Sequence, residues 1–184
     1  MFRHRAPLAL AVAAALLAVN AGAAQIPRPS PEFAVQMVDG RQELLSKHRG
    51  KVVALAFLLT YCSHCQQTTK ILSKLQNEYG PRGFQVLGSA TEEMAVLAVP
   101  EFIKQFQPAF PVGFNQRNAV MEYLQHPPMY RMMMPQVVFV DRQGVIRAQH
   151  SGDDPFFNAD QEKNIRSLVE LLLAEKTRTA ARRK

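Results

Sequence analysis

The apolar segment that leads into the two cysteines constrains the fold more than any other part of the chain. Residues 52–59, "VVALAFLL", are β-branched, aliphatic or aromatic, and the run ends three residues before Cys62. A continuous apolar run of this length is typical of a strand that is buried on both faces of a sheet. The next segment, 63–79, has helical periodicity, and its predicted apolar face consists of Ile71, Leu72, Leu75 and Tyr79. A buried strand that passes directly into a helix predicts an α/β fold.

The rest of the chain alternates between strand and helix patterns. A proline-rich extended lead-in is expected at 25–33, and a strand with a turn at 33–42. Strands are predicted at 83–90 and 109–115, and helices around 100–107, at 116–125 and at 160–176. Pro100 suits the first turn of its helix. Residues 136–150 predict a hairpin that turns at 142–144. The order is βαβ, an inserted segment, then ββα, which predicts one domain with a central mixed β-sheet flanked by helices.

The N-terminus has the organisation of a secretory signal peptide. The basic segment "MFRHRAP" precedes the apolar "LALAVAAALLAV", and small residues follow, with Ala21 and Ala23 at suitable cleavage positions. The apolar run is shorter than the roughly 20 residues of a spanning helix. We therefore expect a signal peptide at 1–24, a domain at 25–176 and a basic flexible tail at 177–184. The mature protein is expected to be exported to a periplasm or an equivalent compartment and to be soluble there.

The positive charge of the chain lies at its two ends. The formal net charge is +7, but 15 Lys and Arg residues lie between Gln25 and Glu175, where all 15 Asp and Glu residues also lie. The domain itself is therefore neutral. A neutral domain is not typical of a protein that binds nucleic acid, so we expect no nucleic-acid partner.

The position of the cysteines favours a reactive dithiol. Cys62 is predicted to lie where the buried strand meets the helix, and Cys65 one turn inside that helix. Unpaired N–H groups and the positive end of the helix dipole favour a thiolate at such a position. His64, between the cysteines, can add positive charge and lower the pKa of Cys62 further. The sequence therefore predicts a pair used for thiol–disulfide exchange.

Other uses of two cysteines fit the sequence less well. A permanent disulfide between Cys62 and Cys65 would close too short a loop to constrain the unfolded chain much. A closed zinc site needs four ligands, and the chain has no second C-x-x-C or H-x-x-x-H pattern. A peroxidatic cysteine would need a P-x-x-x-[ST]-x-x-C setting, which Thr60 and its neighbours do not provide.

Two motifs and an insertion resemble the thioredoxin superfamily, and most closely its exported TlpA- and ResA-like thiol–disulfide oxidoreductases. The motifs are "VVALAFLLTYCSHC" and "MMPQVVFVDRQG", and the insertion lies between the strand and helix in the middle of the chain. The similarity covers roughly residues 33–176. It implies the thioredoxin-like fold, a redox-active C-x-x-C disulfide and no further cofactor.

The resemblance also implies roles for individual residues. Cys62 would be the attacking cysteine and Cys65 the resolving one. Met134-Pro135 occupies the place of the family's cis-proline, which would leave the Met134 backbone free to pair with a bound substrate segment. Tyr61 stands where the family usually has tryptophan, and we expect it to bind substrate together with Met134 and Pro135.

The acidic groups of the family are missing from their usual positions. Thioredoxin's buried acid on the central strand corresponds to Ala56, and the acid that ResA-like proteins carry three residues after the second cysteine corresponds to Thr68. Both acids help to move protons during reduction. His64, by contrast, is similar to the histidine of the more oxidising DsbA and protein disulfide isomerase. The direction of electron flow is therefore open at this point.

Two further hypotheses compete with the oxidoreductase. Methionine thioethers and thiolates select Cu(I), so a copper chaperone or metal-site assembly factor of the same fold is the alternative. Its ligands would come from the cysteines and from Met129, Met132, Met133, Met134, His126 and His150. A non-catalytic interaction module is the third hypothesis. For the leading one, the expected partners are protein thiols and disulfides and a membrane electron donor or acceptor. Family analogy adds apocytochrome c, hence cytochrome c biogenesis, and copper-site proteins. A monomer is expected.

Overall fold

The computed structural model describes residues 24–182, so the predicted signal peptide lies almost wholly outside the described part. One mixed sheet organises the molecule, with the strand order β1-β8-β7-β4-β5-β6-β2-β3. Its strands are β1 (Arg28–Pro29), β2 (Ala34–Gln36), β3 (Gln42–Leu44), β4 (Val52–Leu58), β5 (Phe84–Ala90), β6 (Val112–Phe114), β7 (Gln136–Val140) and β8 (Val145–His150). The predicted central mixed sheet is confirmed.

The central strand β4 has a parallel neighbour on one side and an antiparallel neighbour on the other. It pairs with β5 from Val52 opposite Phe84 to Leu58 opposite Ala90. On its other side it pairs with β7, where Phe57 lies opposite Gln136. The ends of β4 and β5 and the beginning of β7 therefore lie together at one end of the sheet. The segment with both cysteines starts from this end.

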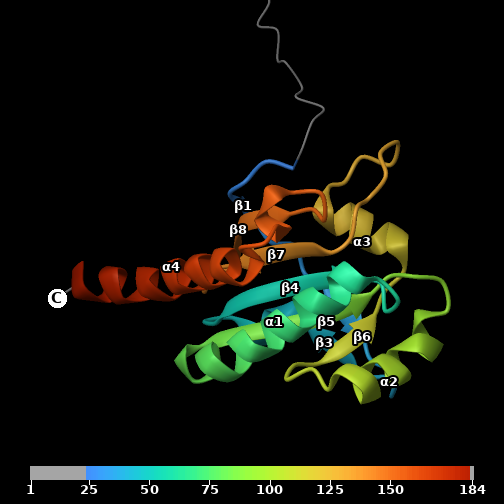
Figure 1. Cartoon of the computed structure of the whole chain (residues 1–184). Helices are drawn as coiled ribbons and strands as arrows, with labels where there is room; N and C mark the ends of the chain where they lie inside the picture. Colours follow the sequence, from blue (N-terminus) through green and yellow to red (C-terminus); the bar gives the residue numbers. More distant parts are fainter. Residues whose placement is uncertain (1–23, 183–184) are drawn as a thin grey trace, which may run out of the picture.

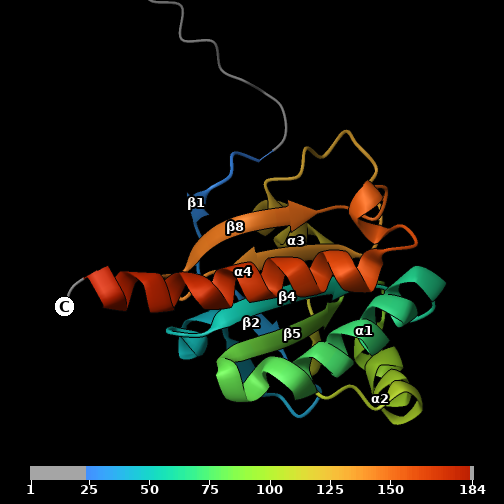
Figure 2. The same ribbon diagram turned by 60° about the vertical axis from the view of Figure 1, so that its left-hand side comes forward.

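Helices cover both faces of the sheet. Helices α1 (Ser63–Tyr79), α2 (Ala95–Phe106) and α4 (Gln161–Arg182) lie on one face, and α3 (Arg117–Leu124) lies on the other. Figure 1 shows α1 in green and α4 in red in front of the sheet, and Figure 2 shows α3 behind it. Because β4 is covered on both faces, all seven of its residues are buried, as the continuous apolar run predicted.

The alternation of side chains along each strand divides the interior into two cores. Along β4, Ala54 and Ala56 face the core under α1 and α4, whereas Leu55 and Phe57 face the core under α3. This is the two-residue period of a strand, with successive side chains on opposite faces. The apolar face predicted for α1 is confirmed, since Ile71, Leu72, Leu75 and Tyr79 are all buried in the first core.

Helix α2 differs from its prediction. It begins at Ala95, so Pro100 lies inside the helix and not in its first turn. Proline has no N–H to donate to the Val96 carbonyl, which makes it unfavourable there. Burial of Ala95, Val99 and Phe102 against the first core offsets this cost. Tertiary packing therefore overrides the local preference of proline.

At both ends of residues 24–182, the structure has more regular secondary structure than the sequence predicted. Part of the proline-rich lead-in forms β1, which pairs antiparallel with β8 at the edge of the sheet. Helix α4 continues to Arg182, beyond the boundary expected at Lys176, so most of the segment predicted as a tail has a helical backbone. Between residues 24 and 182, no helix is both long and apolar enough to cross a membrane.

Candidate functional site

Cys62 lies at the junction of β4 and α1, as the sequence predicted. It is the N-cap residue of α1, with extended backbone angles (φ −83°, ψ 119°), and its Sγ accepts a hydrogen bond from the Cys65 N–H at 3.4 Å. Its side chain is partly exposed and packs against the edge of the first core. This sulfur is accessible and lies beside the N–H groups that begin the helix, an arrangement that stabilises negative charge.

Cys65 lies beneath Cys62 and is buried. It is a free thiol, as Cys62 is, and only 1% of its surface is exposed. Its Sγ accepts a hydrogen bond from the Leu59 N–H at 3.4 Å. Burial is the main cause that raises the pKa of the Cys65 thiol well above its usual value; Cys62 and the carboxylate of Glu92 raise it further. The two cysteines are therefore unequal, one accessible and one held neutral inside the protein.

The loop before β7 lies at the same end of the sheet as the cysteines. The Met134–Pro135 peptide bond is cis, as the resemblance implied. Pro135 is buried, and Met134 packs against both cores. Because the next residue, Gln136, pairs with Phe57 near the end of β4, Pro135 lies beside the loop that leads to Cys62.

The segment after β8 supports this loop. The Met133 carbonyl accepts hydrogen bonds from the Gly152 N–H and, at 2.6 Å, from Nε2 of the buried Gln136, which also donates to Ser151. Gly152 has no room for a side chain, since a Cβ there would lie 2.3 Å from the Met134 carbonyl oxygen. The backbone at Met134 is therefore held by Gln136, Ser151 and Gly152, which no sequence pattern singles out.

Tyr61 and His64 lie on different sides of the cysteines. Tyr61 is 72% exposed and lines an open groove together with Glu92, Met94 and Leu97. His64 is also exposed, but it lines a separate hollow between the beginning of α1 and the segment before α4. The influence of His64 on Cys62 stays a prediction.

Glu92 is an acidic residue at the site that the sequence patterns did not single out. It follows the end of β5, and its Oε1 accepts hydrogen bonds from the N–H and the hydroxyl of Thr60, in the loop between β4 and Cys62. Its Oε2 is buried and has no hydrogen-bond partner among the described residues. Position alone could have revealed it, because the C-terminal ends of neighbouring parallel strands meet at one edge.

The two positions where the family's acids are missing have other roles here. Ala56 is an apolar contact in the first core. The buried Thr68 hydroxyl donates to the His64 carbonyl and accepts a 2.6 Å hydrogen bond from Gln161, which ties α1 to the beginning of α4. Neither residue offers a titratable group to the dithiol.

The arrangement does not favour the copper hypothesis. Met132 is buried in the second core, on the α3 side of the sheet. His150 stacks on Phe156, with 3.7 Å between ring centroids, and pairs with Asp154 at 2.9 Å. His126 lies 3.1 Å from the Tyr130 carbonyl oxygen. These side chains are committed to packing and to local hydrogen bonds.

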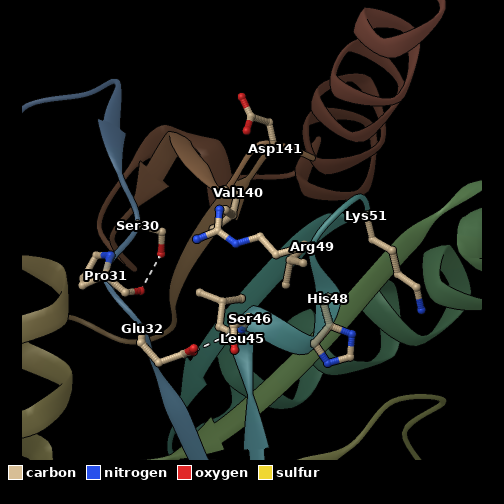
Figure 3. Close-up of a pocket in the computed structure, with 12 residues that line it drawn as sticks. Ser30, Pro31, Glu32, Leu45, Ser46, His48, Arg49, Lys51, Val140 and Asp141 are labelled. Atoms are coloured by element: carbon tan, nitrogen blue, oxygen red, sulfur yellow. Dashed lines mark hydrogen bonds between the residues drawn. The ribbon is translucent and has the colours of Figure 1, made fainter.

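A small cavity of about 50 Å³ lies at the opposite end of the sheet. Figure 3 shows the residues that line it. It is lined by residues from the beginning of β4 and the end of β7, among them Val53, Val140 and Asp141. Glu32, also at this cavity, accepts a hydrogen bond from the Ser46 N–H. Because the cysteines follow the other end of β4, this cavity is not part of their site.

Comparison with known proteins gives concordant similarities. The family model described as Redoxin matches residues 27–165. The thiol-disulfide oxidoreductase ResA of Bacillus thuringiensis is 24% identical over 129 residues, which cover 70% of this chain and 71% of ResA. The thioredoxin-like protein YneN of Bacillus subtilis is 27% identical over 124 residues, which cover 67% of this chain and 69% of YneN.

Solved structures show the same fold. A protein from Chlorobium tepidum, assigned as the thiol:disulfide interchange protein DsbE, superposes with a TM-score of 0.64 at 26% identity, over 78% of this chain and 96% of that one. A hypothetical protein from Sinorhizobium meliloti superposes with a TM-score of 0.69 at 15% identity, over 84% and 87% of the two chains. The predicted thioredoxin-like fold is therefore confirmed.

Proposed function

Because the chain belongs to the Redoxin family, as a ResA-like member of the thioredoxin superfamily, we propose that it is a thiol–disulfide oxidoreductase that works through Cys62 and Cys65. The observation that carries this proposal is the inequality of the two thiols. Cys62 is partly exposed at a helix N-terminus, whereas Cys65 is buried and its sulfur is within hydrogen-bond distance of the Leu59 N–H. An exchange reaction through a dithiol uses an accessible thiolate as the attacking group and a second thiol that resolves the mixed disulfide.

The reaction has two steps, and the dithiol itself carries the two electrons without a further cofactor. The Cys62 thiolate attacks a substrate disulfide, forms a mixed disulfide with one substrate sulfur and releases the other as a thiol. The Cys65 sulfur then attacks Cys62. This forms the Cys62–Cys65 disulfide, breaks the mixed disulfide and releases the second substrate thiol. The reverse sequence oxidises a substrate dithiol.

The surroundings of the dithiol support a protein substrate. Tyr61, Met94 and Leu97 are exposed apolar side chains along the groove beside Cys62. Met129 and Tyr130 are exposed in the loop that leads to Pro135. Exposed apolar surface next to a reactive group is typical of a site for another polypeptide. We propose that Met134, Pro135 and Tyr61 contact this substrate segment, and that His64 tunes the dithiol.

Compartment and partners follow from the proposed chemistry. A dithiol protein with a signal-like N-terminus suits export to a periplasm, and a disulfide exchange partner in the membrane would supply or accept electrons. Apocytochrome c and copper-site proteins are the candidate substrates that the family resemblance suggests.

The direction of electron flow follows from the reduction potential of the Cys62–Cys65 pair. A value near or below about −270 mV would make the protein a reductase, and one between about −180 and −120 mV an oxidant or isomerase.

Insulin reduction and trapping of mixed disulfides test the proposal. We expect Cys62→Ser to lose insulin-reducing activity, because it removes the nucleophile. Cys65→Ser should accumulate mixed disulfides with substrate, visible on non-reducing gels and by mass spectrometry, because the resolving thiol is gone. Gln67→Ala, an exposed position in the same helix, is the control and should keep activity within about twofold. Full activity in Cys62→Ser would refute the assignment.

A further inference from the structure

We propose that Glu92 is the proton acceptor and donor for Cys65, in place of the acids that are missing at Ala56 and Thr68. The proposal rests on the function proposed above, because it concerns the step in which Cys65 resolves the mixed disulfide. It assigns to a residue in the loop after β5 a role that the family places on the central strand or on the first helix.

The contacts of Glu92 place its carboxylate against the loop that binds the Cys65 sulfur. Its Oε1 is bound by Thr60, and the residue before Thr60, Leu59, donates its N–H to the Cys65 sulfur. Glu92 and Cys65 are thus joined through two adjacent residues of one short loop. The Thr60 carbonyl is held in turn by Nε2 of Gln66 at 2.9 Å, which keeps this loop in place.

The second carboxylate oxygen of Glu92, Oε2, is buried. It accepts no hydrogen bond from the described residues, although a buried carboxylate oxygen usually has a donor. A buried, unpartnered oxygen is unfavourable for stability, and its retention near a reactive group is typical of a functional site. A lone pair that no structural hydrogen bond uses is free to receive a proton.

The chemistry of Cys65 requires such a base. A neutral buried thiol is a poor nucleophile, since the thiolate is the reactive form. Burial, together with the nearby negative charge of Glu92, raises the pKa of Cys65, so a thiolate does not form there spontaneously near neutral pH. Proton transfer to a carboxylate during the attack removes this obstacle.

In the resolving step, the Cys65 proton moves to the Glu92 carboxylate as the Cys65 sulfur attacks Cys62, and the Cys62–Cys65 bond forms. The mixed disulfide breaks, the substrate leaves as a thiolate, and the proton on Glu92 passes to that thiolate or to solvent. In the oxidising direction, Glu92 returns the proton to Cys65 as this sulfur is displaced. The carboxylate is unchanged after each turnover.

Other ionisable groups share this part of the surface. Tyr61, Glu93 and Arg117 line the same groove as Glu92, and Cys62 lies above Cys65. Glu101 of α2 lies outside this groove, and its side chain is 72% exposed. It is therefore the control position, because Glu101→Gln removes the same charge without changing the groove.

Stopped-flow reaction of the reduced protein with 5,5′-dithiobis(2-nitrobenzoate) separates the two steps. Attack by Cys62 releases the first thionitrobenzoate, and attack by Cys65 on the mixed disulfide releases the second. We expect Glu92→Gln to keep the first phase and to slow the second at least about tenfold, since general acid–base catalysis contributes 10²- to 10⁴-fold. The variant keeps an oxygen acceptor for Thr60, so the loop is preserved. Glu101→Gln should leave the second phase within about twofold.

The pH profile separates a proton-transfer role from a structural one. In the native protein the second phase should accelerate as a carboxyl group ionises, and Glu92→Gln should lose this inflection while Glu92→Asp retains it. A second phase of normal rate and pH profile in Glu92→Gln would overturn the proposal for Glu92. Loss of the first phase in the native protein would instead refute the role of Cys62, on which the proposal rests.

Discussion

At the scale of single residues, the two cysteines of the site differ in solvent exposure. The two sulfur atoms belong to one helical turn, yet Cys62 is partly exposed and Cys65 is buried. The difference follows from helix geometry, because Cys62 is the cap residue before the first turn, whereas Cys65 lies in that turn and packs into the first core, between α1 and the sheet. One motif of four residues therefore supplies both an attacking and a protected thiol.

Alkylation of the reduced protein measures this difference. Because the pKa of Cys65 is raised, its thiol stays neutral at pH 8, and we expect iodoacetamide to modify Cys62 more than about tenfold faster. Peptide mapping by mass spectrometry after timed quenching gives the two rates. In concentrated guanidinium chloride the two cysteines should react at similar rates, which is the control. Equal rates in the folded protein would contradict the buried state of Cys65.

At the scale of elements, packing and local preference disagree in α2. Pro100 is exposed and lies in the sixth position of the helix, where it removes one backbone hydrogen bond. The buried side chains of Val99 and Phe102 on either side hold the helix against the first core. The helix forms because the apolar area that it buries outweighs the missing hydrogen bond.

Pro100→Ala should therefore stabilise the protein. Alanine restores the N–H donor to the Val96 carbonyl and removes the clash of the ring, although it also increases the entropy of the unfolded chain. We expect the free energy of unfolding to rise by about 1 kcal/mol, measured by urea denaturation. Gln105→Ala, another exposed position of α2, should change it by less than about 0.5 kcal/mol. A lower urea midpoint for Pro100→Ala would contradict this account of α2.

At the scale of the whole molecule, α4 joins the C-terminal half to the helix of the dithiol. Arg166 of α4 donates to Glu78 at 2.5 Å and to the Tyr79 hydroxyl at 2.7 Å, both at the end of α1. Glu162 accepts from Lys74 of α1 at 2.7 Å. Hydrogen bonds from Arg166 lower the pKa of Glu78, and those from Lys74 and Arg166 lower the pKa of Glu162.

The stabilisation that this contact provides should depend on pH. A carboxyl group whose pKa is lower in the folded state stabilises the fold above its unfolded pKa, about 4.3 for Glu, and loses that contribution as the pH falls through its folded pKa. We expect Arg166→Met to lower the urea midpoint at pH 7, and its difference from the native protein to shrink by pH 3. Lys163→Met, an exposed cation of the same helix, is the control. A difference that stays constant between pH 7 and pH 3 would show that the ion pairs do not contribute.

The sequence by itself determined the features that depend on contiguous residues. The run 52–59 specified a strand that is covered on both faces, and the periodicity of 63–79 specified the limits and the buried face of α1. The C-x-x-C spacing placed Cys62 at the start of that helix and Cys65 in its first turn. Periodicity and capping operate over a few residues, so they can be read along the chain.

Only the tertiary structure decided the features that depend on distant segments. Glu92 meets Thr60 across 32 positions of the chain, and Gly152 packs against the Met134 carbonyl. The burial that keeps Pro100 inside α2 also comes from other elements. No local pattern encodes such contacts, because they exist only after β5 and β7 have been brought beside β4, and β8 beside β7. The strand order of the sheet therefore set the environment of the dithiol, while the local sequence set its position.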